Sequence, residues 1–358
     1  MISYLLNKIG YALLTLFGVV TVIFFLFNVL PGDPAQMMLG QNEDSEQLAI
    51  VKQKYGFDKP ISTQYFYYIN DLLPISFHSK KAEDYTFLRQ GKYNETKLFS
   101  IGNTTTVLKF PYLRESFTKQ GKRVSEVLAE TLPNTFVLAV SAIIIAIILG
   151  VLLGIVSALY KDKWLDKTIQ IFSTFGMSIP SFFSAILFAW FFGYVLHKYT
   201  NLEMTGSLYE LDDFGEAMHI KWKNLILPAV VLGIRPLAVV IQLMRNSLLE
   251  VFNQDYIRTA RAKGLSEFQI IRKHALKNAL NPVVTAISGW FASMLAGAVF
   301  VEYIFGWNGL GKEIVNALNT LDLPVIMGSV LVIATLFVII NIFVDLIYVW
   351  LDPKVKLQ

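Results

Sequence analysis

The stretch YIRTARAKGLSEFQIIRKHA, residues 256–275, is strongly charged and lies between two of the most apolar runs of the chain. From residue 254 to residue 263 the pattern fits an amphipathic helix, because Ile257 and Ala260 share one face and basic side chains occupy the other. A polar segment of this kind belongs outside the bilayer, between two spans. The alternation of polar segments with apolar runs along the chain decides the fold.

A sharp turn and a second helix follow this first helix. Gly264 fits the left-handed position just past a helix end, and Ser266 with Gln269 forms an S-x-x-Q capping box that begins the next helix. The face of this second helix is expected to carry Phe268, Ile271 and Ala275. The turn is expected to present Lys263, Gly264 and Leu265 outward. Pro282 either stops the second helix or marks entry into the next apolar run.

The composition indicates a membrane protein. Of 358 residues, 54% are hydrophobic and 16% are charged, and the mean hydropathy is +0.50. Soluble domains carry charge on roughly a quarter of their positions. Cysteine is absent, which excludes disulfides, thiolate metal sites and cysteine nucleophiles. The net charge of +4 is too small to indicate a nucleic-acid partner.

Six apolar runs are long enough to cross a bilayer, which takes about 20 residues. They occupy residues 9–30, 132–159, 168–196, 225–244, 283–305 and 325–350. The first run exceeds a signal-peptide core and lacks a small-residue cleavage site, so we expect it to remain as an anchor that ends at LPGDP, residues 30–34. The predicted fold class is an all-α polytopic membrane protein with six transmembrane helices.

These runs also divide the chain. We expect an N-terminal transmembrane helix at residues 1–31, an insert at residues 32–131, and a core of five transmembrane helices at residues 132–358 that carries a polar loop at residues 246–281. The insert has mixed charge, many Tyr and Phe residues and no lasting apolar period. It therefore indicates a small folded domain or cap, whose secondary structure the pattern leaves open.

Basic residues in the short segments predict the orientation. With the N-terminus inside, the inner segments hold Lys8, Lys161, Lys163, Lys167, Arg245, Arg258, Arg261, Lys263, Arg272, Lys273, Lys277, Lys354 and Lys356. The outer short loops hold only Lys198, Lys221, Lys223 and Lys312. This asymmetry predicts both termini and the polar loop in the cytoplasm, and the insert on the extracytoplasmic side.

Two features within the spans bear on helix packing. Gly150 and Gly154 form a GxxxG pattern, which lets helices approach closely but is also common by chance in apolar helices. Pro180, in GMSIPSFF, is expected to bend the third span near its middle. At about 1.5 Å per residue this run is longer than a bilayer core of roughly 30 Å, so a bend or tilt is expected in any case.

Three interpretations of the polar loop follow from its residues. It is a basic connector that enforces topology, an amphipathic element lying on anionic lipid, or a docking surface for a soluble cytoplasmic protein. Two capped amphipathic helices are more than a connector needs.

The same residues carry a resemblance to a known family. DYIRTARAKGLSEFQIIRKHALKNALNPVV, followed by GAVFVEYIFGWNGLGKEIVNAL and NIFVDLIYVWLDP, resembles the inner-membrane permease subunit of binding-protein-dependent ABC importers, in the dipeptide, oligopeptide and nickel subgroup. LPGDPA after the first run and LILPAVVLG in the fourth run fit the same subgroup. The resemblance covers nearly the whole chain except the insert.

In that family the cytoplasmic loop carries the EAA motif, Glu-Ala-Ala-x-x-x-Gly, whose helix sits in a cleft of the ATP-hydrolysing subunit. Placed on Gly264, the first three motif positions are Arg258, Thr259 and Ala260, so only Ala260 and Gly264 match the general pattern. The RTARAKG form is typical of the peptide subgroup, although the acidic contact is missing. The ATPase-coupling residues implied by the resemblance are Asp255, Tyr256, Arg258, Thr259, Ala260, Arg261, Gly264, Leu265 and Phe268.

The resemblance implies a permease subunit of an ATP-binding-cassette importer for peptides or similar solutes, in a bacterial inner membrane. The implied partners are a homologous second permease, two cytoplasmic ABC ATPase subunits, an extracytoplasmic substrate-binding protein and the lipid bilayer, with no nucleic acid. ATP and Mg would bind to the ATPase subunits, and this chain would hold no cofactor. The alternative is a partner-independent secondary transporter or channel, which the scarcity of intramembrane charge disfavours.

Other motifs give little sign of catalysis. GWNGLGKE, residues 306–313, fits G-x-x-x-x-G-K but has Glu where a phosphate loop needs Ser or Thr, and it is expected outside, where ATP is absent. Glu302 caps or solvates the outer end of the fifth span. No catalytic constellation is evident, so we expect no enzyme activity in this chain. The histidines lack metal-ligand spacing and are expected at the surface: His78, His197, His219 and His274.

Arg235, in LGIRPLAV, is the one Lys or Arg deep in a predicted span. A cation at the bilayer centre costs at least about 2.5 to 3.5 kcal/mol, so Arg235 should face protein or water. It either pairs with an intramembrane acid such as Asp345 or contacts backbone freed by Pro236, or it lies on the translocation path and attracts a substrate carboxylate. The sequence leaves these alternatives open.

Overall fold

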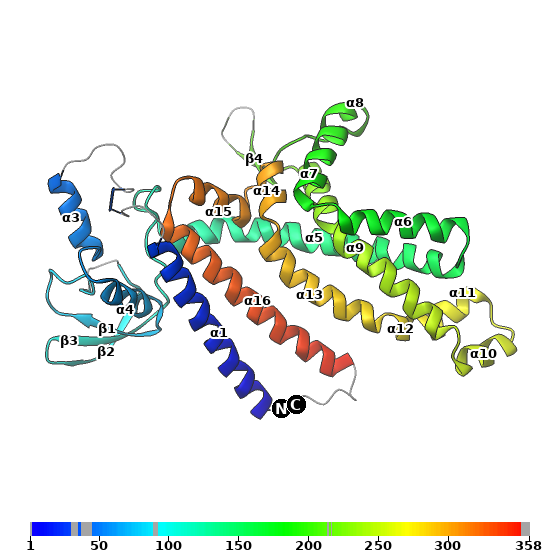
Figure 1. The fold of residues 1–358 in the computed structure, drawn as a ribbon, viewed down its shortest axis with the longest axis horizontal. Coiled ribbons are helices and arrows are strands. Elements are labelled where there is room, and N and C mark those ends of the chain that lie inside the picture. Colours follow the sequence, from blue (N-terminus) through cyan, green and yellow to red (C-terminus); the bar gives the residue numbers. More distant parts are fainter. Residues whose placement is uncertain are drawn as a thin grey trace. The chain divides into compact units, whose positions relative to one another are not determined.

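The computed structural model describes residues 2–29, 35–36, 45–88, 92–212, 215 and 217–351. The chain divides into two compact units, whose elements are labelled in Figure 1. The first unit comprises Met1–Glu130 and Asn316–Thr335, and the second comprises Thr131–Val315 and Leu336–Gln358. The expected helix end at residues 30–34, and the basic residues Lys354 and Lys356, lie outside the described residues.

Apolar helices of membrane length make up most of the described chain. Within it, four continuous helices qualify as spans: α1 (Ile2–Val29), α5 (Val124–Leu159), α9 (Lys223–Val251) and α16 (Leu323–Leu351). Two bent pairs also qualify: α6 (Trp164–Ser178) with α7 (Ser181–Trp190), and α13 (Asn281–Gly297) with α14 (Val299–Phe305). Counted as one span each, the pairs bring the number to as many as six. The predicted polytopic, helical fold class is confirmed.

Pro180 breaks the third span, as its position predicted. The axes of α6 and α7 meet at 110°, and Pro180 is the N-cap residue of α7. Proline has no amide hydrogen to continue the helical ladder, so the bend falls there. Beyond α7 the chain continues through the π-helical turn η1 (Phe191–Val195) and α8 (His197–Thr200) to a two-stranded sheet of β4 (Tyr209–Leu211) and β5 (Met218–Ile220).

Two glycines bring α5 and α9 into close contact. A Cβ atom added at Gly150 would lie 2.6 Å from Val240 Cγ1, and one added at Gly154 would lie 2.6 Å from Met244 Cβ. Real Cβ atoms do not approach so closely, so neither position accepts a larger residue without a shift of α9. The GxxxG pattern therefore serves helix packing here.

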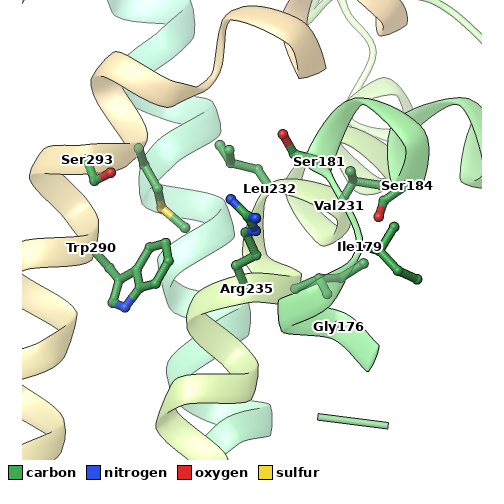
Figure 2. Close-up of a pocket in the computed structure, with 11 residues that line it drawn as sticks. Gly176, Ile179, Ser181, Ser184, Val231, Leu232, Arg235, Trp290 and Ser293 are labelled. Carbon is green, nitrogen blue, oxygen red and sulfur yellow. The ribbon is translucent and has the colours of Figure 1, made fainter. Parts of the chain in front are cut away.

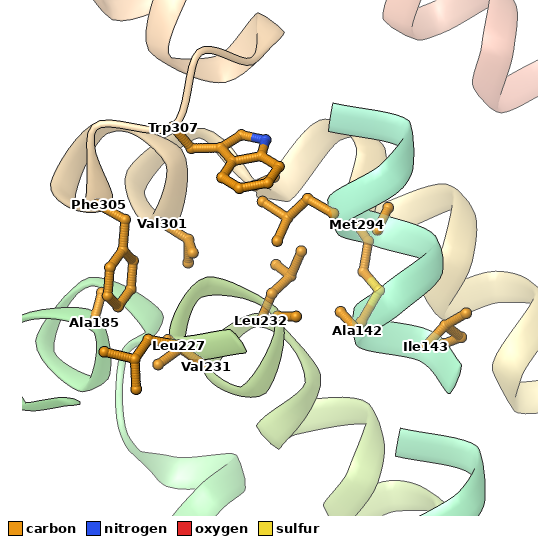
Figure 3. Close-up of a cluster of buried hydrophobic side chains, with 14 of the residues drawn as sticks. Ala142, Ile143, Ala185, Leu227, Val231, Leu232, Met294, Val301, Phe305 and Trp307 are labelled. Atoms are coloured by element: carbon orange, nitrogen blue, oxygen red, sulfur yellow. The ribbon is translucent and has the colours of Figure 1, made fainter. Parts of the chain in front are cut away.

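The core of the second unit lies where α5, α7, α9, α13 and α14 meet (Figure 3). Its buried side chains include Leu138, Ala142, Ala185, Leu227, Val231, Leu232, Met294, Phe305 and Trp307. Alanines on α5 and α7 let the backbones approach, while larger side chains from α9, α13 and the end of α14 fill the remaining space. This packing holds the two halves of each bent span in fixed positions within the unit.

The insert in the first unit combines helices with a small sheet. α3 (Ser45–Tyr55) and α4 (Ile61–Leu72) precede β1 (Ile75–Ser79), β2 (Glu95–Ile101) and β3 (Thr104–Lys109). The strands form an antiparallel sheet in the order β1-β3-β2, with a bulge between Lys97 and Phe99 of β2.

A buried carboxylate organises the interior of the insert. Asp71, in the last turn of α4, is only 1% exposed. Arg114 Nε lies 3.0 Å from Asp71 Oδ2, and the hydroxyls of Tyr85 and Tyr93 donate to the two Asp71 oxygens at 2.7 and 3.2 Å. Lys109 Nζ donates to the backbone carbonyl of Asp71. The buried charge is thus paired and hydrogen-bonded, as buried charges must be.

His78 is buried, so its predicted surface position is wrong. Its Nε2 lies 2.9 Å from Ser76 Oγ, and its Nδ1 lies 2.8 Å from the carbonyl oxygen of Thr86. Burial lowers the pKa of His78 below its usual 6.5, although the hydrogen bond to Thr86 opposes the shift. The residue was misplaced because a lone histidine in a segment without clear periodicity gives no sign of which way it points.

Acid should destabilise the first unit through His78. Because its pKa is lower in the folded chain, the unfolded chain binds more protons around and below about pH 6.5, and stability falls as the pH drops through that region. We expect the apparent melting temperature in detergent to fall more between about pH 7.5 and about pH 5.5 for the wild type than for His78→Gln, which cannot be protonated. Equal falls, measured by circular dichroism, would contradict this role of His78.

Candidate coupling loop and transport path

The polar loop at residues 246–281 forms a compact helical hairpin after α9. Its elements are α10 (Asp255–Ala262), α11 (Glu267–Ile270), the π-helical turn η2 (Ile271–Ala275) and α12 (Leu276–Ala279). The chain then enters α13, where Pro282 occupies one of the first two helical positions. Pro282 therefore marks entry into the next span.

The turn between α10 and α11 has the predicted geometry. Gly264 has φ of 76°, the left-handed conformation expected after a helix end. A Cβ atom at Gly264 would meet nothing within 4 Å, so the backbone angle, not crowding, requires glycine. The Gln269 amide donates to Ser266 Oγ at 3.4 Å, and the Ser266 amide donates to Gln269 Oε1 at 3.2 Å. Both halves of the predicted capping box are present.

An apolar cluster ties the loop to the neighbouring spans. Ile257 and Ala260 of α10 are buried on one face, as predicted. They belong to a cluster that also contains Val240, Met244, Leu248 and Val251 of α9, and Ile270, Ala275, Ala279 and Val283 from the second half of the loop and α13. Through this cluster α10 shares its buried apolar face with α9, with the second half of the loop and with the start of α13.

Two loop residues differ from the prediction. Phe268 is 71% exposed and does not share a buried face with Ile271 and Ala275. Leu265 is half-buried against the apolar cluster instead of pointing outward. The π-helical turn at residues 271–275 explains the first difference: its wider turn changes which positions align, so Ile270 is buried in place of Phe268.

The outer surface of the hairpin gathers most of the predicted coupling residues. Those exposed are Asp255, Tyr256, Arg258, Thr259, Arg261, Gly264 and Phe268. Arg261 Nε lies 3.1 Å from Glu267 Oε1 across the turn, and Asn278 Nδ2 donates to the Tyr256 hydroxyl at 2.8 Å. Of the nine predicted residues, Ala260 is buried and Leu265 is half-buried. The result is a fixed polar surface with two exposed aromatic rings.

A buried ion pair next to the loop was missed at the sequence level. Arg245 of α9 meets Asp166 of α6 through two hydrogen bonds, Nε to Oδ1 at 2.8 Å and Nη2 to Oδ2 at 2.6 Å. Ser157 Oγ of α5 donates to Asp166 Oδ1 at 2.5 Å. Three helices are therefore joined at one carboxylate. Arg245 had been counted only as a basic loop residue, since nothing in the pattern connects it with an acid 79 positions away.

Loss of Arg245 should strongly destabilise the second unit. Arg245→Ala leaves Asp166, which is 2% exposed, as an unpaired buried charge, and such a loss costs about 3 to 5 kcal/mol. Arg245→Lys keeps the charge but loses the two-pronged geometry, so its effect should be smaller. The matched control is Arg245→Met with Asp166→Leu, which removes both charges. In thermal unfolding in detergent, the double variant should melt above Arg245→Ala; the opposite order would contradict the argument.

The segment at residues 306–313 resembles a phosphate loop, but its backbone amides bind a carboxylate of the same chain. Glu302 is fully buried, and its Oε2 accepts hydrogen bonds from the backbone amides of Gly311 at 2.6 Å and Lys312 at 3.2 Å. These amides open α15 (Leu310–Asn319), so Glu302 caps α15 and does not cap or solvate the outer end of the fifth span, as had been predicted. A side chain at Gly309 would collide with the Glu302 carboxylate. The glycines fit a carboxylate of this chain, which agrees with a chance match to the nucleotide motif.

Trp307 and Lys312 close the same turn. Trp307 is fully buried, and its Nε1 donates to the Asn134 carbonyl oxygen at 3.0 Å. Lys312 Nζ donates to the Gly306 carbonyl oxygen at 3.0 Å and to Asn308 Oδ1 at 2.9 Å. The lysine of the motif thus folds back onto its own loop. Among the described residues, no three His, Asp or Glu side chains gather to hold a metal ion.

Arg235 lines a pocket between the α6–α7 break, α9 and α13. Figure 2 shows its guanidinium directed into the space between Trp290 and Ser181. The other lining residues are Gly176, Ile179, Ser184, Val231, Leu232, Ile234, Ser293 and Met294. Arg235 is exposed in this chain, and within the described residues it makes no ion pair or side-chain hydrogen bond. The side chain of its predicted partner Asp345 lies outside the described residues.

The apolar helices and the helical hairpin between two of them define a polytopic membrane component of a transport system. The chain belongs to the family described as binding-protein-dependent transport system inner membrane component, whose model matches residues 150–357. The model of the N-terminal part of such membrane components matches residues 1–85.

Relatives that match over their full length are named as transport system permease proteins. The dipeptide transport system permease protein of Alkalihalophilus pseudofirmus is 33% identical over 99% of this chain and 100% of its own length. The di/tripeptide transport system permease protein of Pseudomonas aeruginosa is 31% identical over 100% of both chains. The glutathione transport system permease protein of Salmonella typhimurium is 30% identical over 99% of both.

This membership decides between the two function classes left by the sequence. The chain is an ABC importer permease component and not a partner-independent transporter or channel. It is not itself an enzyme, since its relatives are transport permeases. It is a multi-pass protein of the inner membrane, from a family that works with ATPase and binding-protein partners.

Proposed function

We propose that this chain forms, with a homologous second permease, the translocation path for peptides or similar solutes. In this proposal an extracytoplasmic binding protein delivers the solute, and two cytoplasmic ATPase subunits hold ATP and Mg while this chain holds no cofactor. Both termini and the loop at residues 246–281 lie in the cytoplasm. The substrates named for the relatives, dipeptides, di/tripeptides and glutathione, are all short peptides, which supports a peptide-like solute.

The observation that supports the coupling role is the apolar cluster that α10 shares with α9, the second half of the loop and the start of α13. A surface that transmits work must not flex, and α10 is held from beneath by Ile257 and Ala260 within the buried cluster. The exposed side chains of the hairpin include Tyr256 of α10 and Phe268 of α11, which are 41% and 71% exposed, among basic and polar groups. Exposed aromatic residues on a rigid base are the usual anchors of protein interfaces. We assign this surface to the ATPase.

Phe268→Ala should uncouple transport while the chain remains folded. The ring is largely exposed, so its loss removes little internal packing, whereas an interface anchor is worth about 2 kcal/mol or more, roughly a thirtyfold loss of affinity. ATPase subunits should co-purify poorly with the variant, and peptide uptake should fall. Lys277→Ala, exposed in α12 away from the turn, is the control and should retain both. Full ATPase recovery with Phe268→Ala would contradict the assigned contact.

A pair of substitutions at Gly264 tests the turn itself. Gly264→Val should impair coupling, because a β-branched residue at φ of 76° is strained by about 1 to 3 kcal/mol. Gly264→Asn should retain most activity, since asparagine tolerates the left-handed conformation. Membrane abundance of both variants is measured by immunoblot alongside uptake. Equal uptake by the valine and asparagine variants would show that the conformation of this turn does not matter for coupling.

For the path, we propose that Arg235 binds the carboxylate of a passing peptide. Its guanidinium shares the pocket with the hydroxyl-bearing residues Ser181, Ser184 and Ser293. The pocket also borders the first turn of α7, whose N-cap Pro180 supplies no side-chain hydrogen bond to the free amides there. Half-helix N-termini of broken spans commonly face anionic substrate groups in transporters. Together the guanidinium, the serine hydroxyls and the amides of α7 favour binding of a carboxylate over binding of a neutral or cationic group.

Arg235→Ala should therefore discriminate between peptides by their C-terminus. Loss of a hydrogen bond to a charged group costs about 1.5 to 3 kcal/mol, so uptake of a dipeptide with a free carboxylate should fall about tenfold or more. Uptake of the C-terminally amidated dipeptide, slow in the wild type, should change little. ATPase co-purification serves as the control for assembly. If the variant lowered uptake of both peptides equally, Arg235 would have a structural role instead.

A further inference from the structure

In β1, the first strand of the insert, polar side chains are buried and apolar side chains are exposed. Ser76 and His78 are 0% exposed, whereas the intervening apolar residues Ile75 and Phe77 are 54% and 57% exposed. Successive side chains of a strand point to opposite faces, so one face of β1 is polar and buried and the other is apolar and open. A sheet with one face in water normally shows the reverse arrangement.

The neighbouring strands extend the open face, although β2 is exposed on both faces. Thr106 of β3 is paired with Phe77 of β1 on one side and Phe99 of β2 on the other, so two aromatic rings flank it on the open face. Ile101 at the end of β2 is 74% exposed. We call the surface formed by Ile75, Phe77, Phe99, Ile101 and Leu108 the apolar sheet face; by register it also carries the polar residues Ser79, Thr96 and Thr104, and the buried Thr106. All residues of β1, β2 and β3 are described, and by strand register none on this face is charged.

The polar side of the sheet faces the buried Asp71 and its partners. Lys109 of β3 reaches the backbone of Asp71, and His78 lies against Tyr93 with ring centroids 4.8 Å apart. The sheet thus buries Ser76, His78 and Lys109 and exposes Ile75, Phe77 and Leu108, while charged residues such as Lys80, Asp84 and Lys97 are exposed elsewhere on the insert. Membrane-inserted strands show this distribution, with apolar residues toward lipid and polar residues toward the interior. In water, an open apolar patch of this kind would favour aggregation.

The contacts of α4 place the insert beside a membrane span. Tyr65 of α4 lies 2.7 Å from Thr21 of α1, hydroxyl to hydroxyl, and the rings of Tyr65 and Tyr68 pack on Phe24. Thr21 and Phe24 lie in the last two turns of the apolar segment Asn7–Asn28 of α1. The insert therefore occupies the depth at which the bilayer begins.

We infer that the apolar sheet face lies on the membrane, with Phe77, Phe99 and Ile101 in contact with lipid acyl chains. A protein partner would require more polar complementarity: protein interfaces form about one hydrogen bond per 100 to 200 Å², and this face offers few groups beyond threonine hydroxyls. Lipid requires only apolar area at the right depth. The same reasoning applies to either leaflet, so the inference is independent of the orientation and the substrate proposed above.

Single-cysteine labelling of the full chain tests this inference directly. The natural sequence has no cysteine, so Phe77→Cys, Phe99→Cys and Ile101→Cys each give one labelling site. Each variant is labelled with an environment-sensitive NBD fluorophore and reconstituted in vesicles of phosphatidylethanolamine and phosphatidylglycerol. Quenching is then measured with lipids that carry a doxyl group at a shallow or deep acyl position, and with aqueous iodide added to both sides.

Two further variants calibrate the measurement. Phe17→Cys, 55% exposed within the α1 span, reports lipid contact. Gln120→Cys is exposed in the turn whose Ser116 and Thr118 bond to Asp322, the residue before α16, so it reports the aqueous end of a span. Ile101 is so exposed that its replacement disturbs little packing, which keeps the test valid should either phenylalanine variant fold poorly.

Labels at positions 77, 99 and 101 should be quenched by shallow doxyl lipid several-fold more than the label at position 120, and should resist iodide as the label at position 17 does. Strong iodide quenching with no doxyl effect would overturn the inference. Protection from iodide that appears only when a binding protein or a second permease is added would also overturn it, because the face would then be a protein interface.

Discussion

The contact between the polar hairpin and the spans beneath it is the interaction on which a transport role depends. Ile257 and Ala260 share one buried apolar cluster with Met244, Leu248 and Val283, and this cluster is the link that the proposed coupling role requires between α10, α9 and α13. The Arg245–Asp166 pair extends this connection to α6. A change at the hairpin can therefore be passed, as a rigid movement, to the helices that line the Arg235 pocket.

Most of the membrane fold was predictable from sequence, because its rules are local. Runs of apolar residues predicted the spans, and Pro180 predicted the bend in the third span. Gly264 and the capping box at Ser266 predicted the turn of the hairpin. Each depends on residues within a few positions of one another. Phe268 was misplaced because a π-helical turn adds a residue to the helical period, and the apolar pattern around it is the same for either helix type.

The features that escaped prediction depend on distant residues. Asp166 and Arg245, like Asp71 and Arg114, are ordinary charged residues in the sequence and become paired only through the fold. The sheet of the insert was hidden for a second reason. Its first strand buries Ser76 and His78 and exposes Ile75 and Phe77. A prediction that places apolar residues inside and polar residues in water therefore assigns the wrong face of this strand to the interior. Arg235 was recognisable as unusual, but only the structure shows it beside the break in the third span.

The 110° angle at Pro180 has a consequence for hydration. If either α6 or α7 runs along the membrane normal, the other must lie nearly flat in the plane of the bilayer. The backbone amides of the first turn of α7 then lie within the hydrocarbon region, where lipid offers them no hydrogen-bond acceptor. Such a gap in the helical ladder persists only where protein or water reaches it. The kink therefore requires protein or water at these amides, on the side where Arg235 lines the pocket.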